Sequence, residues 1–340
     1  MATIEDVARL AGLSRTTVSR VINDQPYVTE EKKEKIIEAM EQLGYVPNSS
    51  ARRLRSQRTE TIAVLLPRVT NPFFGHLIEA MELKASEYGY QVIVCQTHDK
   101  KQKELDYLQL LKTKQVDGVV MTSLANQWKA IEPYLESGPV VLCNEYMETE
   151  QVSMVHIDHR QAAYDATVHL IEQGCNRIAY STGSQETHIT DQRKQGFLQA
   201  LNDYKLVFPK ELEINGALDV KDGQQVFSFL QQQAQRVDGI FTGSDEVAAG
   251  IIYAASESGW KIPEDLAVIG FDNQMISLLM APAITTIQQP VDEMAKKTIE
   301  ILVGKIKSEE YRLEKQYVYN YELLKRKSTE RLNIKESAST

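Results

Sequence analysis

Apolar residues recur every three or four positions over the first 44 residues, the spacing of one face of a helix. The pattern predicts three short helices. In order, their apolar positions are Ile4, Val7, Ala8 and Ala11; Val18, Val21 and Ile22; and Ile36, Ile37, Met40 and Leu43. Glycine readily takes the left-handed conformation that ends a helix, so Gly12 and Gly44 are expected to terminate the first and third helices.

Polar residues before each of these helices are suitable caps. Thr3 followed by Asp6 is close to a capping box, Ser14 can cap the second helix, and Thr29 opens the third. The "AGLS" between the first two helices allows a tight turn, so the segment is expected to form a helix-turn-helix.

From Thr61 onward the sequence pattern changes to short runs rich in β-forming residues, separated by amphipathic stretches long enough to form helices. The runs are "TIAVLLP", "QVIVCQ", "VDGVVMT", "PVVLCN", "RIAYST", "VDGIFTG" and "LAVIGFD", and the expected helices include 75–89, 102–113, 161–173, 193–204 and 245–258. Continuous apolar strands that alternate with helices indicate parallel sheets covered on both faces. The expected fold class is α/β: an N-terminal helix-turn-helix headpiece followed by a two-lobed, doubly wound parallel-sheet body.

These patterns set the expected domain boundaries, with the second lobe starting near Asp158. We expect a headpiece at 1–47, a linker at 48–58, a first lobe formed by 61–158 with 289–318, a second lobe formed by 159–288 with 319–330, and a disordered tail at 331–340. The whole polar stretch 327–340 is expected to fray. The basic linker "SSARRLRSQR" is too short to hold a helix alone, so we expect it to order only with a partner.

The net charge of −9 argues at first against a nucleic-acid partner, but the charge is unevenly spread. Residues 1–58 carry ten Lys and Arg against eight Asp and Glu, and the remainder carries 28 against 39. The acidity therefore belongs to the body. No apolar run reaches the roughly eighteen residues that a membrane helix needs, and "MATIEDVARL" does not resemble a signal peptide. We therefore expect a cytoplasmic protein that does not bind membranes.

The residues that often carry enzyme chemistry show no catalytic pattern. The sequence contains no GxGxxG, phosphate loop, GxSxG or HExxH, so we expect neither an enzyme nor a cofactor. His156 and His159 in "VHIDH" have no thiol or third histidine nearby, which favours a structural pair over a metal site. Cys95, Cys143 and Cys175 are far apart and are interpreted as buried free thiols.

The second helix has an unusual polar face formed by Arg15, Thr16, Ser19 and Arg20, opposite its apolar residues. Short hydroxyls can approach phosphates or base edges, and guanidiniums can pair with guanine O6 and N7 in the major groove. On these residues alone, a solvated surface helix remains the alternative.

In the body, ligands are expected beyond the carboxyl ends of the strands, where the two lobes face each other. The candidate residues that follow the apolar runs are Asn71, Phe73, Phe74, Asn144, Ser244, Asp245, Asp272 and Asn273.

The stretch "TIEDVARLAGLSRTTVSRVINDQPYVTEEKKEKIIEAMEQLGYVPNSSARRL" resembles the DNA-binding headpiece of the LacI/GalR family of bacterial transcription regulators. The resemblance continues through "LLPRVTNPFF", "DGVVM", "TGSDEVAAG" and "VIGFDNQMISLLMAPAITTIQQP" and covers roughly residues 2–328. It implies base readout by Arg15, Thr16 and Arg20, with Arg15 and Thr16 setting the operator sequence. It implies phosphate contacts from Thr3, Ser14, Thr17, Ser19, Asn23 and Tyr27.

The resemblance also implies that the linker is a hinge helix placed in the minor groove of DNA. Ala51, Leu54 and Arg55 would lie in the groove, with Leu54 as an apolar wedge that bends the duplex. Arg52, Arg53 and Arg55 would neutralise nearby phosphates. The alternative for Leu54 is an ordinary packing role, although "SSARRLRS" contains few other apolar residues for it to pack against.

The body resembles an effector domain of the periplasmic-binding-protein type. The resemblance implies effector contacts from Phe73, Phe74, Asn144, Arg193, Ser244, Asp272 and Gln289. A turn-forming role for Asp272 and a surface salt bridge for Arg193 remain alternatives. Many relatives have an aromatic residue, on which a sugar can stack, where this chain has Leu218. The resemblance therefore does not imply that the effector is a sugar.

These observations predict a homodimeric repressor that binds double-stranded operator DNA and is controlled by a small-molecule effector. A near-palindromic operator with half-sites about 10 bp apart is expected, and the tail has no heptad that would build a tetramer. Some relatives bind a phosphorylated carrier protein, which the acidic Glu79, Glu82 and Glu300 would repel. The competing class is a solute-binding or metabolic α/β protein with an incidental helical extension.

Overall fold

The computed structural model describes residues 2–22, 25–45, 58–183, 187–308 and 315–331. The chain divides into two compact units, 1–58 and 59–340, each of which is described here by itself. The expectations for Asn23, for Ala51, Leu54 and Arg55 in the linker, and for the tail beyond Arg331 fall outside the described residues.

The first unit contains the three expected helices, α1 (Ile4–Ala11), α2 (Arg15–Ile22) and α3 (Glu30–Leu43). Val7, Val18 and Ile36, one from each helix, are completely buried and form the centre of a small core. Gly12 has a φ of 65°, the left-handed conformation that the turn between α1 and α2 requires.

The expected caps are present with one exception. Thr3 and Asp6 form a complete capping box, and the Ser14 Oγ accepts a hydrogen bond from the Thr17 backbone N–H at 3.1 Å. Thr29 lies at the N-cap position of α3 but makes no side-chain cap. Ile37 was expected to face inward and is 50% exposed, because the buried stripe of α3 runs through Ile36 and Ala39 instead.

The body contains two six-stranded sheets, which confirms the expected doubly wound α/β class. The first sheet has the order β11-β5-β4-β3-β1-β2 and comprises β1 (Thr61–Leu66), β2 (Gln91–Gln96), β3 (Gly118–Met121), β4 (Val140–Cys143), β5 (Ser153–Ile157) and β11 (Gln316–Tyr319). The second has the order β12-β10-β9-β8-β6-β7 and comprises β6 (Ile178–Thr182), β7 (Glu213–Asn215), β8 (Gly239–Thr242), β9 (Ala267–Phe271), β10 (Thr285–Gln288) and β12 (Glu322–Leu324). Among these strands only β12 is antiparallel to its neighbour.

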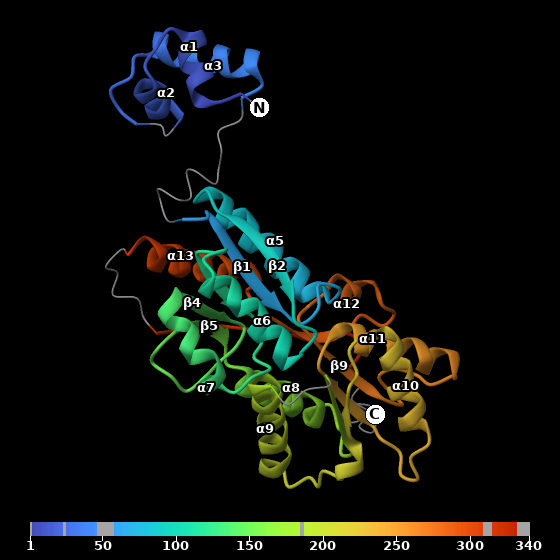
Figure 1. The fold of residues 1–340 in the computed structure, drawn as a ribbon. Helices are drawn as coiled ribbons and strands as arrows, with labels where there is room; N and C mark the ends of the chain where they lie inside the picture. Colours follow the sequence, from blue (N-terminus) through green and yellow to red (C-terminus); the bar gives the residue numbers. More distant parts are fainter. Residues whose placement is uncertain (1, 23–24, 46–57, 184–186, 309–314, 332–340) are drawn as a thin grey trace. The chain divides into compact units, whose positions relative to one another are not determined.

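Helices cover both faces of each sheet (Figure 1). The first lobe has α5 (Pro72–Glu87), α6 (Lys101–Lys112), α7 (Trp128–Ile131), the 3₁₀ turn η1 (Glu132–Ser137) and α13 (Val291–Lys307). The second has α8 (His159–Glu172), α9 (His188–Asp203), η2 (Lys210–Leu212), α10 (Val220–Gln231), α11 (Asp245–Glu257) and α12 (Met275–Leu279). All six residues of β1 are buried, and alternate residues enter different cores: Ile62 packs on the α5 side and Ala63 on the α6 side.

Over its described residues, the polypeptide of the body crosses between the lobes three times. It leaves the first lobe at Asp158, the N-cap of α8, and returns near Gln289, between β10 and α13. It crosses again near Asn320, between β11 and β12. The carboxyl ends of the parallel strands in both sheets therefore border one shared space.

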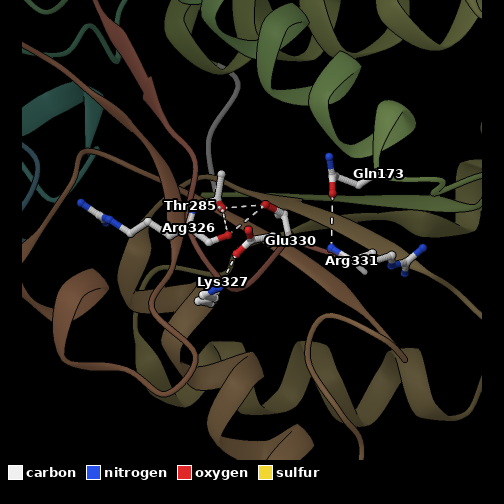
Figure 2. A network of polar contacts seen from close by, with 7 residues as sticks. Gln173, Thr285, Arg326, Lys327, Glu330 and Arg331 are labelled. Carbon is white, nitrogen blue, oxygen red and sulfur yellow. Dashed lines mark hydrogen bonds and ion pairs between the residues drawn. The ribbon is translucent and has the colours of Figure 1, made fainter. Parts of the chain in front are cut away.

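The described residues after β12, up to Arg331, are held firmly, in contrast to the fraying expected for the stretch that begins at residue 327. Ser328 and Thr329 are completely buried. The Thr285 hydroxyl lies 2.7 Å from that of Thr329 and accepts a hydrogen bond from the Arg326 backbone N–H, in the network that Figure 2 shows. Arg331, assigned to the disordered tail, donates its backbone N–H to the Gln173 side-chain oxygen (Figure 2) and its Nε to the Pro263 carbonyl. Polar composition misled the prediction because these hydroxyls and charges bond to the second lobe rather than to water.

Within the described ranges, no helix has the length and apolar character needed to cross a membrane.

Candidate functional site

Helix α2 presents Arg15, Thr16 and Arg20 to solvent, while Val18 on the opposite side is buried in the core. Arg15 and Thr16 are adjacent in the chain, and Arg20 follows Thr16 by four positions, about one helical turn, so the three form a polar surface on the exposed side of α2. Two guanidiniums and a hydroxyl in this arrangement offer the hydrogen-bond donors that guanine and phosphate oxygens accept.

Arg15 forms an ion pair with Glu5 of α1, with 3.2 Å between its Nη1 and the Glu5 Oε1. Both side chains are about two-thirds exposed, so this pair contributes little to stability and can open when a competing acceptor arrives.

The expected phosphate-binding hydroxyls of the headpiece already have local partners. Thr3 donates its hydroxyl to the Asp6 carboxylate at 2.7 Å, and the hydroxyls of Ser14 and Thr17 lie 2.8 Å apart. Ser19 is half-buried, whereas Tyr27 is 97% exposed with a φ of 81°. Ser14 and Thr17 remain at the exposed start of α2, where the backbone N–H groups of a helix attract anions.

A cavity of about 420 Å³ lies in the body where strand ends of both sheets meet. This volume is in the usual range for small-molecule sites. Its lining includes six of the seven expected effector residues, namely Phe73, Phe74, Asn144, Arg193, Ser244 and Asp272. The seventh, Gln289, is not among the lining residues and lies behind Asp272, to whose Oδ1 it donates its Nε2 hydrogen at 2.8 Å.

Arg193 is the central cation of this cavity. Its guanidinium carbon lies 3.4 Å from the ring centroid of Phe271, and its Nη1 donates to the Gly243 carbonyl. Its Nε donates to the Nδ1 of His159, so this buried imidazole is neutral and acts as an acceptor. Burial lowers the pKa of His159 well below its ordinary value, and the nearby charge of Arg193 adds to that effect. Aromatic ring, carbonyl and imidazole thus hold the guanidinium in one orientation.

Two buried carboxylates fix the loop after β3, from which Thr122 and Ser123 line the cavity. Glu104 accepts hydrogen bonds from the backbone N–H groups of Ala125 and Asn126 at 2.8 and 3.0 Å, and Glu145 accepts one from Leu124 at 3.2 Å. Burial raises the pKa of Glu145 to about 8. These side chains do not line the cavity but position residues that do.

Several cavity residues were not among the sequence-based candidates. They include Arg68 after β1, Asp99 after β2, Thr122 and Ser123 after β3, Thr187 and Thr190 at the start of α9, Asp219 before α10, and Glu246 in α11. Asp245 was a candidate, but it points inward and accepts the Gln274 backbone N–H at 2.6 Å. Asn273 likewise binds Arg326 at 2.7 Å rather than facing the cavity.

The remaining histidine and cysteine positions have structural surroundings. His156 and His159 are buried, and within the described part of the chain no three His, Cys, Asp or Glu side chains are grouped to hold a metal ion. The three cysteines are buried free thiols, as expected, and burial raises the pKa of Cys95 to about 11.

Two sequence models of protein families match the chain. The model described as "Bacterial regulatory proteins, lacI family" matches residues 3–48, and "Periplasmic binding proteins and sugar binding domain of LacI family" matches residues 59–326.

Individual proteins resemble the chain over most of its length. The NTD biosynthesis operon regulator NtdR of Bacillus subtilis is 43% identical over 90% of this chain and 93% of its own. The ribose operon repressor of Halalkalibacterium halodurans is 36% identical over 90% and 91%. A solved structure of a LacI family transcriptional regulator from Lactobacillus casei with bound glucose has a TM-score of 0.73 and 32% identity, covering 79% of this chain and 99% of that one. The transcriptional regulator CelR–cellobiose complex has a TM-score of 0.71 and 29% identity, covering 96% and 100%.

Proposed function

Since the chain belongs to the LacI family of bacterial regulatory proteins, a family of transcriptional regulators rather than enzymes, we propose that it is an operator-binding repressor. It acts as a homodimer on a near-palindromic site, and a small molecule bound between the lobes of its body controls it. The observation that carries the proposal is the exposed Arg15, Thr16 and Arg20 face of α2 within a helix-turn-helix.

DNA recognition uses two kinds of contact. Arg15, Thr16 and Arg20 read base edges in the major groove, and the hydroxyls at the start of α2 contact phosphates. For Arg15 the contact replaces its ion pair with Glu5. Ala51, Leu54 and Arg55 are proposed to contact the minor groove, as the family resemblance implies.

Dimerisation follows from the small footprint of one headpiece and from exposed apolar residues on the body. One helix-turn-helix contacts only a few base pairs, so specific binding requires two half-sites about 10 bp apart. Leu83 of α5 and Ile93 of β2 in the first lobe, and Leu278 and Leu279 of α12 in the second, are large apolar side chains exposed to solvent in the single chain. A second copy that covers them would bury this surface.

The effector binds in the cavity that both lobes line. Asn71, Phe73 and Asn144 come from the first lobe, and Arg193 and Asp272 come from the second, so a ligand that contacts all of them stabilises one angle between the lobes. We propose that this angle sets the spacing of the two linkers in the dimer, and thereby the affinity for DNA.

A phosphorylated carrier protein is not proposed as a partner. Glu79 and Glu82 on α5 are exposed, and Lys84 on the same helix pairs with Glu87 and Glu300. This helix therefore presents carboxylates, which repel a phosphate group.

The test is selection of genomic DNA fragments by the purified protein at near-physiological salt, followed by sequencing of the retained fragments. An enriched palindrome that is lost in Arg15→Ala is the expected result. Folded protein that enriches no sequence, either alone or with a metabolite extract, would instead favour a solute-binding protein with an incidental helical extension.

A further inference from the structure

Charged side chains line the effector cavity unevenly. Among the described residues, the lining holds two guanidiniums and four carboxylates, from Arg68, Arg193, Asp99, Asp219, Glu246 and Asp272. If all of these are ionised, the described part of the cavity wall carries two negative charges in excess.

Two of the carboxylates lie near the two cations. The charge of Arg193 opposes the burial that raises the pKa of Asp272, and the charge of Arg68 does the same at Asp99. In each of these two pairs the negative charge of the carboxylate is offset by the positive charge of an arginine. The excess negative charge of the lining therefore comes from Asp219 and Glu246.

Asp219 and Glu246 are held near each other by the packing of two helices. Asp219 is the N-cap of α10, and Glu246 is the second residue of α11. The helices approach so closely that a Cβ at Gly223 would lie 2.3 Å from the Val247 carbonyl oxygen and 3.0 Å from the Gly250 Cα. Both carboxylates therefore border the same side of the cavity.

Helix capping explains Asp219 but leaves Glu246 without a structural task. Asp219 accepts the Asp222 backbone N–H at 3.0 Å, and α11 is already capped by Ser244. Of the residues that the structure describes, none makes an ion pair with either carboxylate. Burial and the negative charge of Asp219 both raise the pKa of Glu246. Asp219 is exposed and Glu246 is half-buried, so the two carboxylates form an acidic edge of the cavity that attracts a cation.

An independent observation also indicates a ligand rich in hydrogen-bond donors. Asn144, at the end of β4, lines the cavity and is only 4% exposed. Its Oδ1 has no hydrogen-bond partner among the described residues. A buried acceptor without a partner costs roughly 1–3 kcal/mol, so a ligand donor that reaches it adds to affinity.

We propose that the effector is a small hydroxylated molecule that carries a protonated amine, with the ammonium group bound by Glu246 and Asp219. Hydroxyl groups of the same molecule donate to Asn144 and Asp272 and accept from Arg193. The proposal rests on the effector role of this cavity and adds the chemical class of the ligand. It is compatible with Leu218, since charge pairing replaces the stacking that an aromatic residue would provide.

The experiment compares protonated Tris with tris(hydroxymethyl)ethane, which has the same three hydroxymethyl arms and a methyl group in place of the ammonium. Melting temperature and calorimetric affinity are measured without DNA at neutral pH and constant ionic strength. The pair D-glucosamine and D-glucose repeats the comparison at larger size. The variants are Glu246→Gln, Asp219→Asn, which retains the cap, and the control Glu257→Gln at the exposed end of the same helix.

The wild type and Glu257→Gln are expected to prefer the amine in each pair by about two- to fivefold in affinity, the effect of one charge pair at a partly exposed site. Glu246→Gln is expected to remove most of that preference. Three outcomes would each overturn the proposal. They are equal shifts in melting temperature from the paired compounds, no shift from either compound, and a preference for the amine that survives in both Glu246→Gln and Asp219→Asn. The same preparations are also tested for selection of operator DNA. If they select operator DNA but show no preference for the amine, only the proposed ligand class is wrong and the repressor proposal stands.

Discussion

The side chain of Gln274 donates a hydrogen bond from its Nε2 to the Oδ1 of Asn71, with 3.2 Å between the two atoms. Asn71 is the N-cap of α5 in the first lobe, and Gln274 is the N-cap residue of α12 in the second. Asn71 also lines the cavity. The two lobes are thus joined directly at the edge of the ligand site.

Gln274→Ala is expected to weaken effector binding two- to tenfold, since one hydrogen bond contributes about 0.5–1.5 kcal/mol. The reason is that the bond favours the lobe arrangement that holds the ligand. Calorimetric titration with the effector, or with the preferred amine probe, measures the change. Gln225→Ala, at an exposed position of α10, is the control and should have no effect. Unchanged affinity in Gln274→Ala would mean that the bond does not influence the lobe angle.

Arg15→Ala and Glu5→Gln are expected to act in opposite directions on DNA binding. Loss of the Arg15 guanidinium removes about 1–3 kcal/mol of discrimination at one base pair and relaxes the selected sequence there. Glu5→Gln releases Arg15 from its ion pair and removes a negative charge near the DNA, so affinity should rise a few-fold. Glu38→Gln removes an equal charge from an exposed position of α3, and fluorescence anisotropy compares all three variants. If Glu38→Gln raises affinity as much as Glu5→Gln does, release of Arg15 is not the cause.

Asp272→Asn is expected to abolish the response to effector while operator binding stays normal. The substitution keeps the shape of the side chain but removes the charge that faces Arg193 and changes the acceptor that Gln289 contacts. Electrophoretic mobility shift of operator DNA, with and without effector, provides the measurement. A variant with normal effector affinity would remove Asp272 from the ligand contacts.

Asp245→Asn is expected to reduce the dependence of stability on pH. Burial raises the pKa of Asp245 to about 8 from its ordinary 3.8, so between these values the folded protein binds a proton that the unfolded chain has released. Stability from this residue is therefore present below pH 3.8 and is lost as the pH rises through about 8, with a slope of at most about 1.4 kcal/mol per pH unit. Urea denaturation from pH 5 to 9 should show a flatter profile for the variant. An identical slope in both proteins would show that Asp245 does not take up this proton.

Gly250→Ala is expected to destabilise the body by about 1–3 kcal/mol, because the added Cβ would lie 2.0 Å from the Val220 carbonyl oxygen. Gly304→Ala in α13 is the matched control, since nothing lies within 4 Å of the added atom. Alanine is the better helix former, so the control should gain up to about 1 kcal/mol. Chemical denaturation distinguishes the two, and equal effects would show that the helix contact can relax.

The central strands were predictable from the sequence because they are buried on both faces and therefore have continuous apolar runs. All residues of β1 and β4 are buried, and both appeared as runs of this kind. By contrast, β7 and β12 span three residues each and leave one residue exposed, so neither periodicity nor composition marks them. Their places in the sheet are fixed by their neighbours rather than by their own residues.

The candidate site was predictable where a strand leads directly into it. Asn144 and Asp272 follow buried strands at the carboxyl edge, and the structure places both in the cavity lining. The same rule selected Asp245, although the first turn of α11 directs Asp245 inward and Glu246 to the cavity. Successive helix residues point about 100° apart, so an error of one position in the helix changes which carboxylate faces the ligand. Asp219 precedes α10, a helix that was not among the expected ones.

The three crossings between the lobes have a consequence for recombination between related genes. Each lobe is assembled from separated stretches of the chain, because β11 and β12 follow one another in sequence but lie in different sheets. A single exchange of gene segments therefore cannot replace one lobe without dividing the other. The headpiece occupies one unbroken stretch that ends by residue 58. A chimaera joined there would combine one protein's operator with another's effector, whereas new ligand preference has to arise by substitution within the body.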